Sequence, residues 1–201
     1  IILLSGYNFV FCLVLNTRII GVILIMNNYN SAEQIGKFVK GKIAELLFEM
    51  MIREDPNRTF TVIPFGYEKT TPELAQYQEL IKNYETLTVI KQSPDFILIK
   101  NDKTKVYFVE VKYRRSLSEF TKKDLKERAE NTIKHWKDTW FFIATQDGFY
   151  FDLGKEIIKN NGELKRLDEK IISPEIQNKY LGVLKEFIAN KTMVDNKSYL
   201  K

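Results

Sequence analysis

Two β-strand patterns joined by a short polar turn decide the fold of this chain. They read Ser93-Pro94-Asp95-Phe96-Ile97-Leu98-Ile99-Lys100, then Asn101-Asp102-Lys103-Thr104-Lys105, then Val106-Tyr107-Phe108-Val109-Glu110-Val111-Lys112-Tyr113. Apolar and β-branched residues dominate the outer runs, and the polar turn between them predicts an antiparallel hairpin. A hairpin folds the start of its first strand beside the end of its second, so we expect Asp95 to lie close to Glu110.

The second strand pattern carries a carboxylate and an ammonium on one side. Glu110 and Lys112 are two residues apart, so both side chains project from the same face, while Val109 and Val111 point the other way. Two close carboxylates repel one another, and a hard divalent cation such as Mg²⁺ relieves that repulsion. A neighbouring lysine can position or deprotonate an attacking water and stabilise charge on a phosphate. The pattern therefore favours phosphodiester hydrolysis, although each part also occurs as ordinary turn or strand chemistry.

Pro94-Asp95 and Glu110-Val111-Lys112 together resemble the core motif of the restriction-endonuclease-like PD-(D/E)xK nucleases. Within that superfamily, residues 109–113 resemble the end of the motif in small Holliday-junction-resolvase-like nucleases. The resemblance covers roughly residues 34–151 in the order of elements. It implies an α/β fold with a restriction-endonuclease-like αβββαβ core, in which helices flank a mixed central sheet.

The resemblance also implies roles for individual residues. Asp95 and Glu110 would be ligands of Mg²⁺, or of Mn²⁺ as a substitute, together with the backbone carbonyl of Val111. Lys112 would orient the water. Such nucleases carry a further acidic residue on a preceding helix, and here the resemblance favours Glu45, in direct or water-mediated contact with the metal. The alternative for Glu45 is a solvated helix glutamate.

The helix that carries Glu45 is visible in the pattern upstream of the hairpin. Ser31-Ala32-Glu33 can cap a helix that continues to Met51. Glu45 and Glu49 lie together on one shoulder of its apolar stripe. The expected members of that stripe are Ile35, Val39, Ile43, Leu46, Leu47 and Met50.

Further elements follow the hairpin. Thr121-Lys122-Lys123-Asp124 opens a helix whose Leu125, Ala129, Ile133 and Trp136 would pack on the sheet. A buried strand is expected over residues 140–145, and Asp147-Gly148 turns the chain into another strand at residues 149–151. With a strand ahead of the hairpin, the order is helix, strand, hairpin, helix, strand. Pro174 opens a last helix, in which Ile176, Tyr180, Val183, Leu184 and Phe187 can pack.

Basic residues concentrate just after the proposed active strand. The net charge of +5 is modest, so the position of these residues says more than the total. The cluster consists of Lys112, Arg114, Arg115, Lys122, Lys123, Lys126 and Arg128. Arg114, Arg115, Lys122 and Lys123 are the expected contacts to a phosphate backbone, with a solvated helix face as the alternative. DNA is the expected partner, and RNA is not excluded.

Other catalytic chemistries find little support in the composition. Cys12 is the only cysteine and His135 the only histidine, so one chain can build neither a disulfide nor a cysteine-histidine zinc site. No glycine-flanked nucleophile with a base is present. Carboxylate and lysine chemistry is what remains.

The chain is expected to hold one nuclease domain over residues 26–190. Residues 66–92 form an insertion in which Thr71-Pro72-Glu73 begins a helix, for packing or for substrate recognition. Residues 1–25 are almost wholly apolar and carry a single charge, Arg18. We interpret them as sequence upstream of a start at Met26; an interrupted transmembrane segment is the alternative. Residues 191–201 are expected to be frayed. From Met26, no stable membrane association and a cytoplasmic location are expected.

The sequence thus favours a Mg²⁺-dependent DNA endonuclease, structure-selective or resolvase-like. Two alternatives remain open: a catalytically silent nucleic-acid-binding module of the same fold, and a nuclease subunit of a defence or mobile-element system. A homodimer is expected by analogy alone. Branched, linear and modified DNA are all compatible with the sequence.

Overall fold

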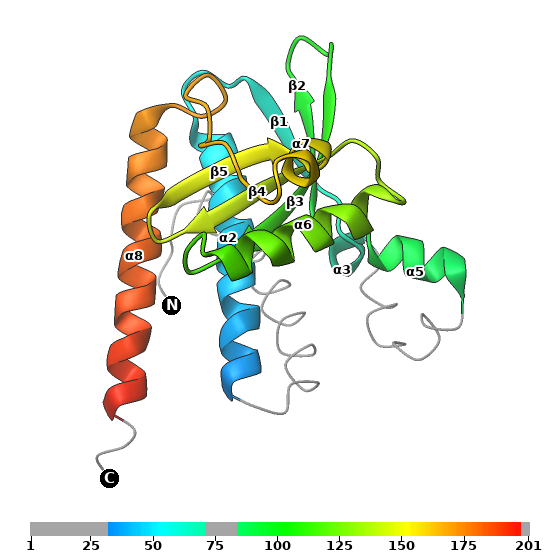
Figure 1. Ribbon diagram of the computed structural model, residues 1–201. Coiled ribbons are helices and arrows are strands. Elements are labelled where there is room, and N and C mark those ends of the chain that lie inside the picture. Colours follow the sequence, from blue (N-terminus) through cyan, green and yellow to red (C-terminus); the bar gives the residue numbers. More distant parts are fainter. Residues whose placement is uncertain (1–31, 71–83, 198–201) are drawn as a thin grey trace, which may run out of the picture. The chain divides into compact units, whose positions relative to one another are not determined.

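The computed structural model describes residues 32–70 and 84–197 (Figure 1). The chain divides into two compact units, residues 1–39 and 40–201. Apart from the first residues of helix α2 (Ala32–Glu54), the features described below lie in the second unit. The predicted leader at residues 1–25, the start at Met26 and the helix predicted from Thr71 lie outside the described residues. The predicted domain boundaries therefore stay predictions.

A five-stranded mixed sheet forms the centre of the second unit. Its strands are β1 (Phe60–Pro64), β2 (Phe96–Lys100), β3 (Val106–Tyr113), β4 (Thr139–Thr145) and β5 (Gly148–Leu153), arranged in that order. Only β3 and β4 are parallel; the other neighbours are antiparallel. A parallel pair needs a crossover, which α6 (Glu119–Ile133) supplies. The predicted αβββαβ order and the mixed α/β sheet are confirmed.

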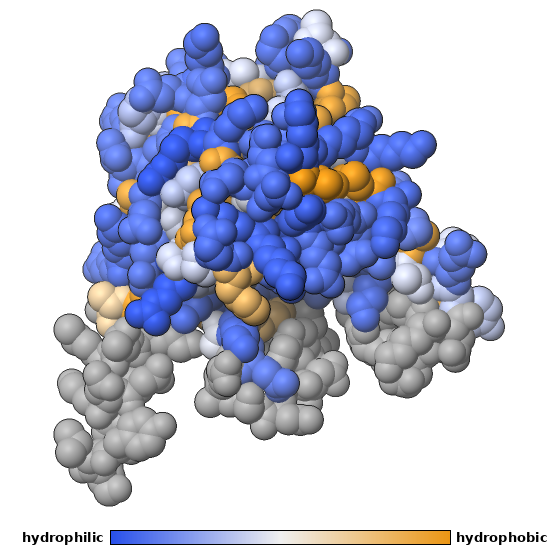
Figure 2. All heavy atoms as spheres, in the orientation of Figure 1, coloured by the Kyte–Doolittle hydropathy of each residue, from blue (hydrophilic) through white to orange (hydrophobic). Residues whose placement is uncertain are grey.

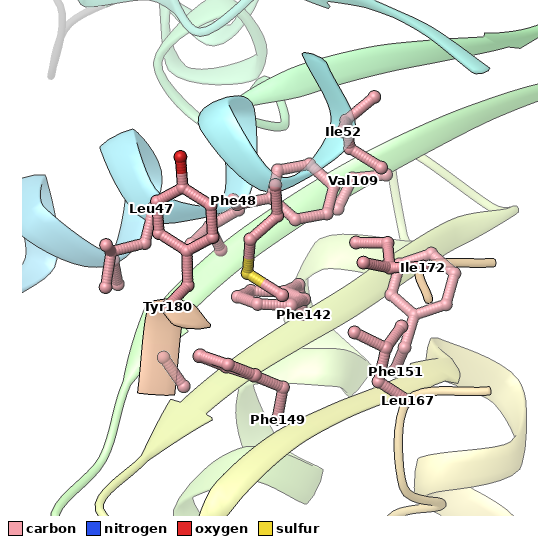
Figure 3. Close-up of a cluster of buried hydrophobic side chains, with 14 of the residues drawn as sticks. Leu47, Phe48, Ile52, Val109, Phe142, Phe149, Phe151, Leu167, Ile172 and Tyr180 are labelled. Carbon is pink, nitrogen blue, oxygen red and sulfur yellow. The ribbon is translucent and has the colours of Figure 1, made fainter. Parts of the chain in front are cut away.

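The alternation of side chains along the strands gives the sheet two covered faces. Helices α2 (Ala32–Glu54) and α8 (Pro174–Lys197) pack on one face, and α6 and α7 (Gly154–Lys159) pack on the other. On the first face, Phe142 lies between the ring of Phe48 at 4.7 Å and that of Phe149 at 5.4 Å (Figure 3). On the second face, Phe141 and Ile143 pack with Leu125 of α6. Val109 and Val111 belong to the first face, as expected.

The buried side of α2 differs from the predicted apolar stripe. Leu46 is 42% exposed, whereas Ala44, Phe48 and Met51 are buried. The large ring of Phe48 contacts Phe96 and Phe142, and this contact decides which side of the helix faces the sheet. The prediction for Leu46 was therefore wrong, and that for Leu47 was right.

Helix α6 begins and ends earlier than predicted. Its first residue is Glu119, because the Ser118 hydroxyl accepts a hydrogen bond from the Thr121 N–H at 3.3 Å and caps the helix. The helix ends at Ile133, so Trp136 lies beyond it, although its ring still packs on Phe108 of β3 at 5.4 Å. Leu125 and Ala129 are buried as predicted.

A glycine after α7 allows this segment to approach α6 closely. Gly162 has φ +89°, a conformation that glycine adopts without strain. A Cβ at this position would lie 2.1 Å from the carbonyl oxygen of Lys122. The next residue, Glu163, pairs with Lys122 at 2.6 Å. The first turns of α6 therefore rest directly on the chain that follows α7.

The described part of the predicted insertion contains the short helices α3 (Tyr67–Thr70) and α5 (Glu85–Lys91). Helix α8 extends to Lys197, and so includes part of the segment expected to be frayed. Within residues 32–70 and 84–197, no helix combines the length and the apolar run that crossing a membrane requires.

Two neighbouring residues of α8 give a matched test of this packing. Leu184 is 1% exposed and Val183 is 45% exposed, although both were predicted to pack. We expect Leu184→Ala to lower the free energy of unfolding by about 2–5 kcal/mol, because it leaves a cavity. Val183→Ala should change it by less than about 0.5 kcal/mol. Urea denaturation measures both, and equal losses would contradict the observed orientation of α8.

Candidate active site

The pairing of β2 with β3 determines where Asp95 lies. Phe96 pairs with Val109, and the same register continued by one residue places Asp95 opposite Glu110. Directly opposite residues of an antiparallel pair share one face of the sheet. The backbone of Asp95 is also anchored from the other side, because its carbonyl accepts hydrogen bonds from the N–H groups of Phe65 at 2.9 Å and Gly66 at 3.2 Å.

The three motif side chains converge at this end of β3. The Val111 N–H donates to Asp95 Oδ2 at 2.8 Å, so the carboxylate takes the place that a strand carbonyl would occupy. Lys112 Nζ forms an ion pair with Glu110 Oε1 and lies 4.0 Å from Asp95 Oδ2. The side chains of Asp95, Glu110 and Lys112 are 19%, 16% and 27% exposed. The three side chains are thus mostly buried, and each keeps a small part of its surface in contact with solvent.

The closeness of these charges shifts their protonation equilibria. Burial, followed by the charge of Glu110, raises the pKa of Asp95 to about 7. For Lys112, burial acts to lower the pKa, but the charges of Glu110 and Asp95 outweigh it and raise the pKa above its ordinary value. Lys112 is therefore a cationic hydrogen-bond donor in this arrangement, which favours orienting a water over deprotonating it.

Glu45 lies near these residues but is held by two lysines. Lys42 Nζ lies 3.1 Å from Glu45 Oε1, and Lys69 Nζ lies 3.0 Å from Glu45 Oε2. Burial opposes ionisation of Glu45, yet the two lysines lower its pKa overall. Its charge contributes to the raised pKa of Asp95, so the two carboxylates interact. The structure brings Glu45 into the electrostatic environment of the site, with both of its oxygens facing ammonium groups.

Glu49, the other acid on the shoulder of α2, is placed differently. It is 5% exposed, and its carboxylate accepts a hydrogen bond from Arg53 Nη2 at 2.8 Å. Arg53 belongs to the same helix, so this ion pair lies along α2.

Three charged residues around Glu45 were not singled out from the sequence: Lys42, Glu68 and Lys69. Lys42 also pairs with Glu68 of α3 at 2.6 Å, and Lys69 Nζ lies over the ring of Phe96 at 3.7 Å. The spacing of Lys42 and Glu45 at i and i+3 on one helix could have indicated their pair. The part played by α3 could not be inferred, because it depends on how the chain returns after β1.

The predicted basic cluster divides into paired and unpaired members. Arg114 pairs with Asp124, which also binds Arg128 at 3.0 Å. Lys122 pairs with Glu119 at 2.7 Å and with Glu163, and Lys126 donates to Asn161 Oδ1 at 3.1 Å. By contrast, Arg115 and Lys123 are exposed, and neither forms an ion pair with any residue in the ranges 32–70 and 84–197.

The donor set suits a divalent cation of the Mg²⁺ type. Asp95 and Glu110 supply hard oxygen donors, and Mg²⁺ commonly uses one or two protein carboxylates while it keeps several waters. Burial, followed by the charge of Glu110, raises the pKa of Asp95, and a bound cation would favour the ionised carboxylate against both effects. Among the residues that the structure describes, no cluster of three or more acidic, histidine or cysteine side chains is spaced for a metal. The fit to a divalent cation therefore rests on Asp95 and Glu110. The carbonyl of Val111 is next to Glu110 in the chain.

Comparisons with known proteins find little similarity. No protein-family model matches the chain, and no curated protein matches its sequence. Among solved structures, the chain is similar to Hjc, a Holliday junction resolvase from the archaeal hyperthermophile Archaeoglobus fulgidus, at 14% identity and a TM-score of 0.31. The similarity covers 66% of this chain and 98% of that one. Because the TM-score is low, the roles proposed below rest on the residues of this chain.

The pKa of Asp95 predicts how stability depends on pH. Its folded-state pKa of about 7 lies above the ordinary value of 3.8, so the folded state binds more protons than the unfolded state between these values. The contribution of Asp95 to the free energy of unfolding is therefore fully present below pH 4 and is lost as the pH rises through 7. In Asp95→Asn this loss should disappear. We expect the metal-free variant to match the unaltered protein at pH 4 and to exceed its free energy of unfolding by about 2–4 kcal/mol at pH 8.

Denaturation in a metal chelator across this pH range measures the difference. Asp147→Asn, which alters an exposed carboxyl in the β4–β5 turn, is the matched control. A difference between Asp95→Asn and the unaltered protein that stays constant with pH would contradict the shifted pKa.

Proposed function

We propose that this chain is a Mg²⁺-dependent DNA endonuclease that hydrolyses phosphodiester bonds and resembles the resolvases in its choice of structured DNA. The observation that supports it most is the convergence of Asp95, Glu110 and Lys112 at the open end of β3. Two carboxylates and a protonated lysine within 4 Å form an electrostatic arrangement that a purely structural strand does not need.

The proposed roles follow from chemistry and position. Asp95 and Glu110 hold the cation through their carboxylate oxygens, with the Val111 carbonyl as a further donor. Bound Mg²⁺, or Mn²⁺ in its place, would lower the pKa of a water and neutralise phosphate charge. Lys112 donates hydrogen bonds that orient the attacking water and stabilise the charge that develops on the phosphate. The fixed N–H of Val111 holds the Asp95 carboxylate in place for this chemistry.

Glu45 is proposed as the auxiliary acid. Its oxygens face Lys42 and Lys69, so it acts on the site through its charge and through waters, unless one of these lysines exchanges for the cation. This arrangement fits the water-mediated version of the predicted contact better than direct ligation.

The basic residues that form no ion pair are the proposed contacts to the phosphates of DNA. Arg115 and Lys123 are exposed and available, whereas Arg114 and Lys122 share their charge with acidic partners. Arg115 and Lys123 therefore contact the backbone of DNA, and Arg114 and Lys122 mainly hold α6 in position. A homodimer remains part of the proposal by analogy, since two sites would cut two strands.

Two other functions stay in view. A catalytically silent nucleic-acid-binding module would share the fold and the basic residues but would not need Lys112. A nuclease subunit of a defence or mobile-element system would use the same reaction with different partners. Intact Asp95, Glu110 and Lys112 favour an active enzyme over the silent module.

Cleavage assays test the reaction directly. With Mg²⁺ or Mn²⁺ and duplex, single-stranded and branched DNA or RNA, we expect metal-dependent cleavage of DNA. Lys112→Ala should lower the rate by at least about 100-fold, because it removes the donor that stabilises transition-state charge. Lys170→Ala, at an exposed lysine of another segment, should leave it unchanged. Absence of cleavage of any substrate would contradict the enzyme, and full activity in Lys112→Ala would contradict the site.

Salt titration tests the DNA contacts. In Ca²⁺, Arg115→Ala and Lys123→Ala should each reduce the slope of log affinity against log salt by about 1, because each removes one phosphate contact. Arg114→Ala should instead lower the melting temperature, since it breaks the pair with Asp124. Fluorescence anisotropy measures the slopes, and unaltered slopes for Arg115→Ala and Lys123→Ala would count against this interface.

A further inference from the structure

Phe120 is the most exposed large apolar side chain among the residues that the structure describes. It is 83% exposed and lies in the first turn of α6. Figure 2 shows that the face of the protein seen there is mainly hydrophilic, with apolar side chains in small groups. A full aromatic ring in water loses the burial free energy that would stabilise the fold. The exposure of Phe120 therefore brings no benefit to the fold itself.

One of the two unpaired cations shares a side of α6 with this ring, and the other precedes the helix in the chain. Lys123 is one helical turn from Phe120, on the same side of α6, and Arg115 lies in the connection that leads into the helix. Two acids of α6 lie close to Phe120 in the helix, Glu119 beside it and Asp124 one turn on. Glu119 pairs with Lys122, and Asp124 pairs with Arg114 and Arg128. An exposed aromatic ring thus lies one helical turn from Lys123, which forms no ion pair with any residue that the structure describes.

The position of Phe120 is fixed relative to the end of β3. Arg114 donates its backbone N–H to the Ala144 carbonyl at 2.9 Å, and its guanidinium pairs with Asp124 in the second turn of α6. The Ser118 cap fixes the first turn. Eight residues separate Phe120 from Lys112, a span of at most about 28 Å when fully extended. A ring on a rigid element at this range can contact the same DNA that enters the site.

We infer that Phe120 is a stacking platform for an unpaired base of the substrate, with Arg115 and Lys123 binding the adjoining phosphates. This inference rests on the proposed function and narrows its substrate to DNA with an unpaired or unstacked base near the cleavage site. Phenylalanine has no hydrogen-bonding group with which to read base edges. Its flat face can stack on the face of a base, which is covered by neighbouring bases in an intact duplex.

Charge argues against a second copy of the chain as the occupant of this surface. A twofold contact centred on Phe120 would bring the patch against itself, so the Arg115 and Lys123 side chains of both copies would meet. Like charges opposed in an interface are unfavourable. The phosphates of DNA complement the same cations.

Matched DNA ligands test the inference. Anisotropy in Ca²⁺ compares a fully paired duplex with a duplex of the same sequence that contains a short single-stranded gap. We expect Phe120→Ala to weaken binding to gapped DNA by about 5- to 100-fold. Binding to the intact duplex should be unchanged. Phe120→Trp should retain the preference for gapped DNA, and Val106→Ala, at another exposed apolar residue, should have no effect.

A base analogue reports the stacking itself. With 2-aminopurine in the gap, the unaltered protein and Phe120→Trp should change its fluorescence, and Phe120→Ala should not. Unchanged binding of gapped DNA by Phe120→Ala would overturn the inference, as would equal weakening with both ligands. A shift from dimer to monomer in Phe120→Ala, measured by light scattering, would overturn it in favour of a protein interface.

Cleavage measured in parallel separates the two proposals. Lys112-dependent cleavage together with no role for Phe120 would overturn the stacking platform alone. Phe120-dependent binding of gapped DNA without cleavage of any substrate would support the stacking platform and overturn the endonuclease.

Discussion

The hydrogen bond from the Val111 N–H to Asp95 Oδ2 is the interaction on which the site depends. The ladder between β2 and β3 ends at the Phe96–Val109 pair, and beyond it a side-chain carboxylate continues the pairing. This bond fixes Asp95 opposite Glu110 at an edge that would otherwise be free to splay. It also holds two carboxylates together in a poorly solvated place. The contacts of Lys112 with both carboxylates and the raised pKa of Asp95 both follow from that placement.

The core provides the rigidity that this placement needs. Alternation along β3 sends Val109 and Val111 into the cluster around Phe142, and sends Glu110 and Lys112 to the other face. The apolar half of the strand is clamped beneath α2 and α8, so the polar half has little freedom to move. Packing free energy on one side of the sheet thus supports an arrangement of repelling charges on the other.

Local sequence patterns predicted the hairpin and its motif residues. They failed for features that depend on contacts between segments far apart in the chain. Hairpin periodicity and turn composition were sufficient for β2, β3 and the opposition of Asp95 and Glu110, because those features depend on neighbours in the chain. The buried side of α2 could not be predicted, since it depends on the fit of Phe48 against Phe96 and Phe142. The lysines that hold Glu45 were also missed, because Lys69 reaches it from a helix placed by the return of the chain after β1.

Gly162 ties the first turns of α6 to a segment of the chain well beyond the motif. The family resemblance ends near residue 151, yet the first turns of α6 rest against residue 162, where a side chain would collide with the backbone of Lys122. Inheritance of the motif and inheritance of its flanking helix are therefore separable. Under the proposed function, a relative that kept every residue of the hairpin but changed the segment after α7 would hold the basic residues of α6 at another angle. Its preference among DNA substrates would then differ while its reaction stayed the same.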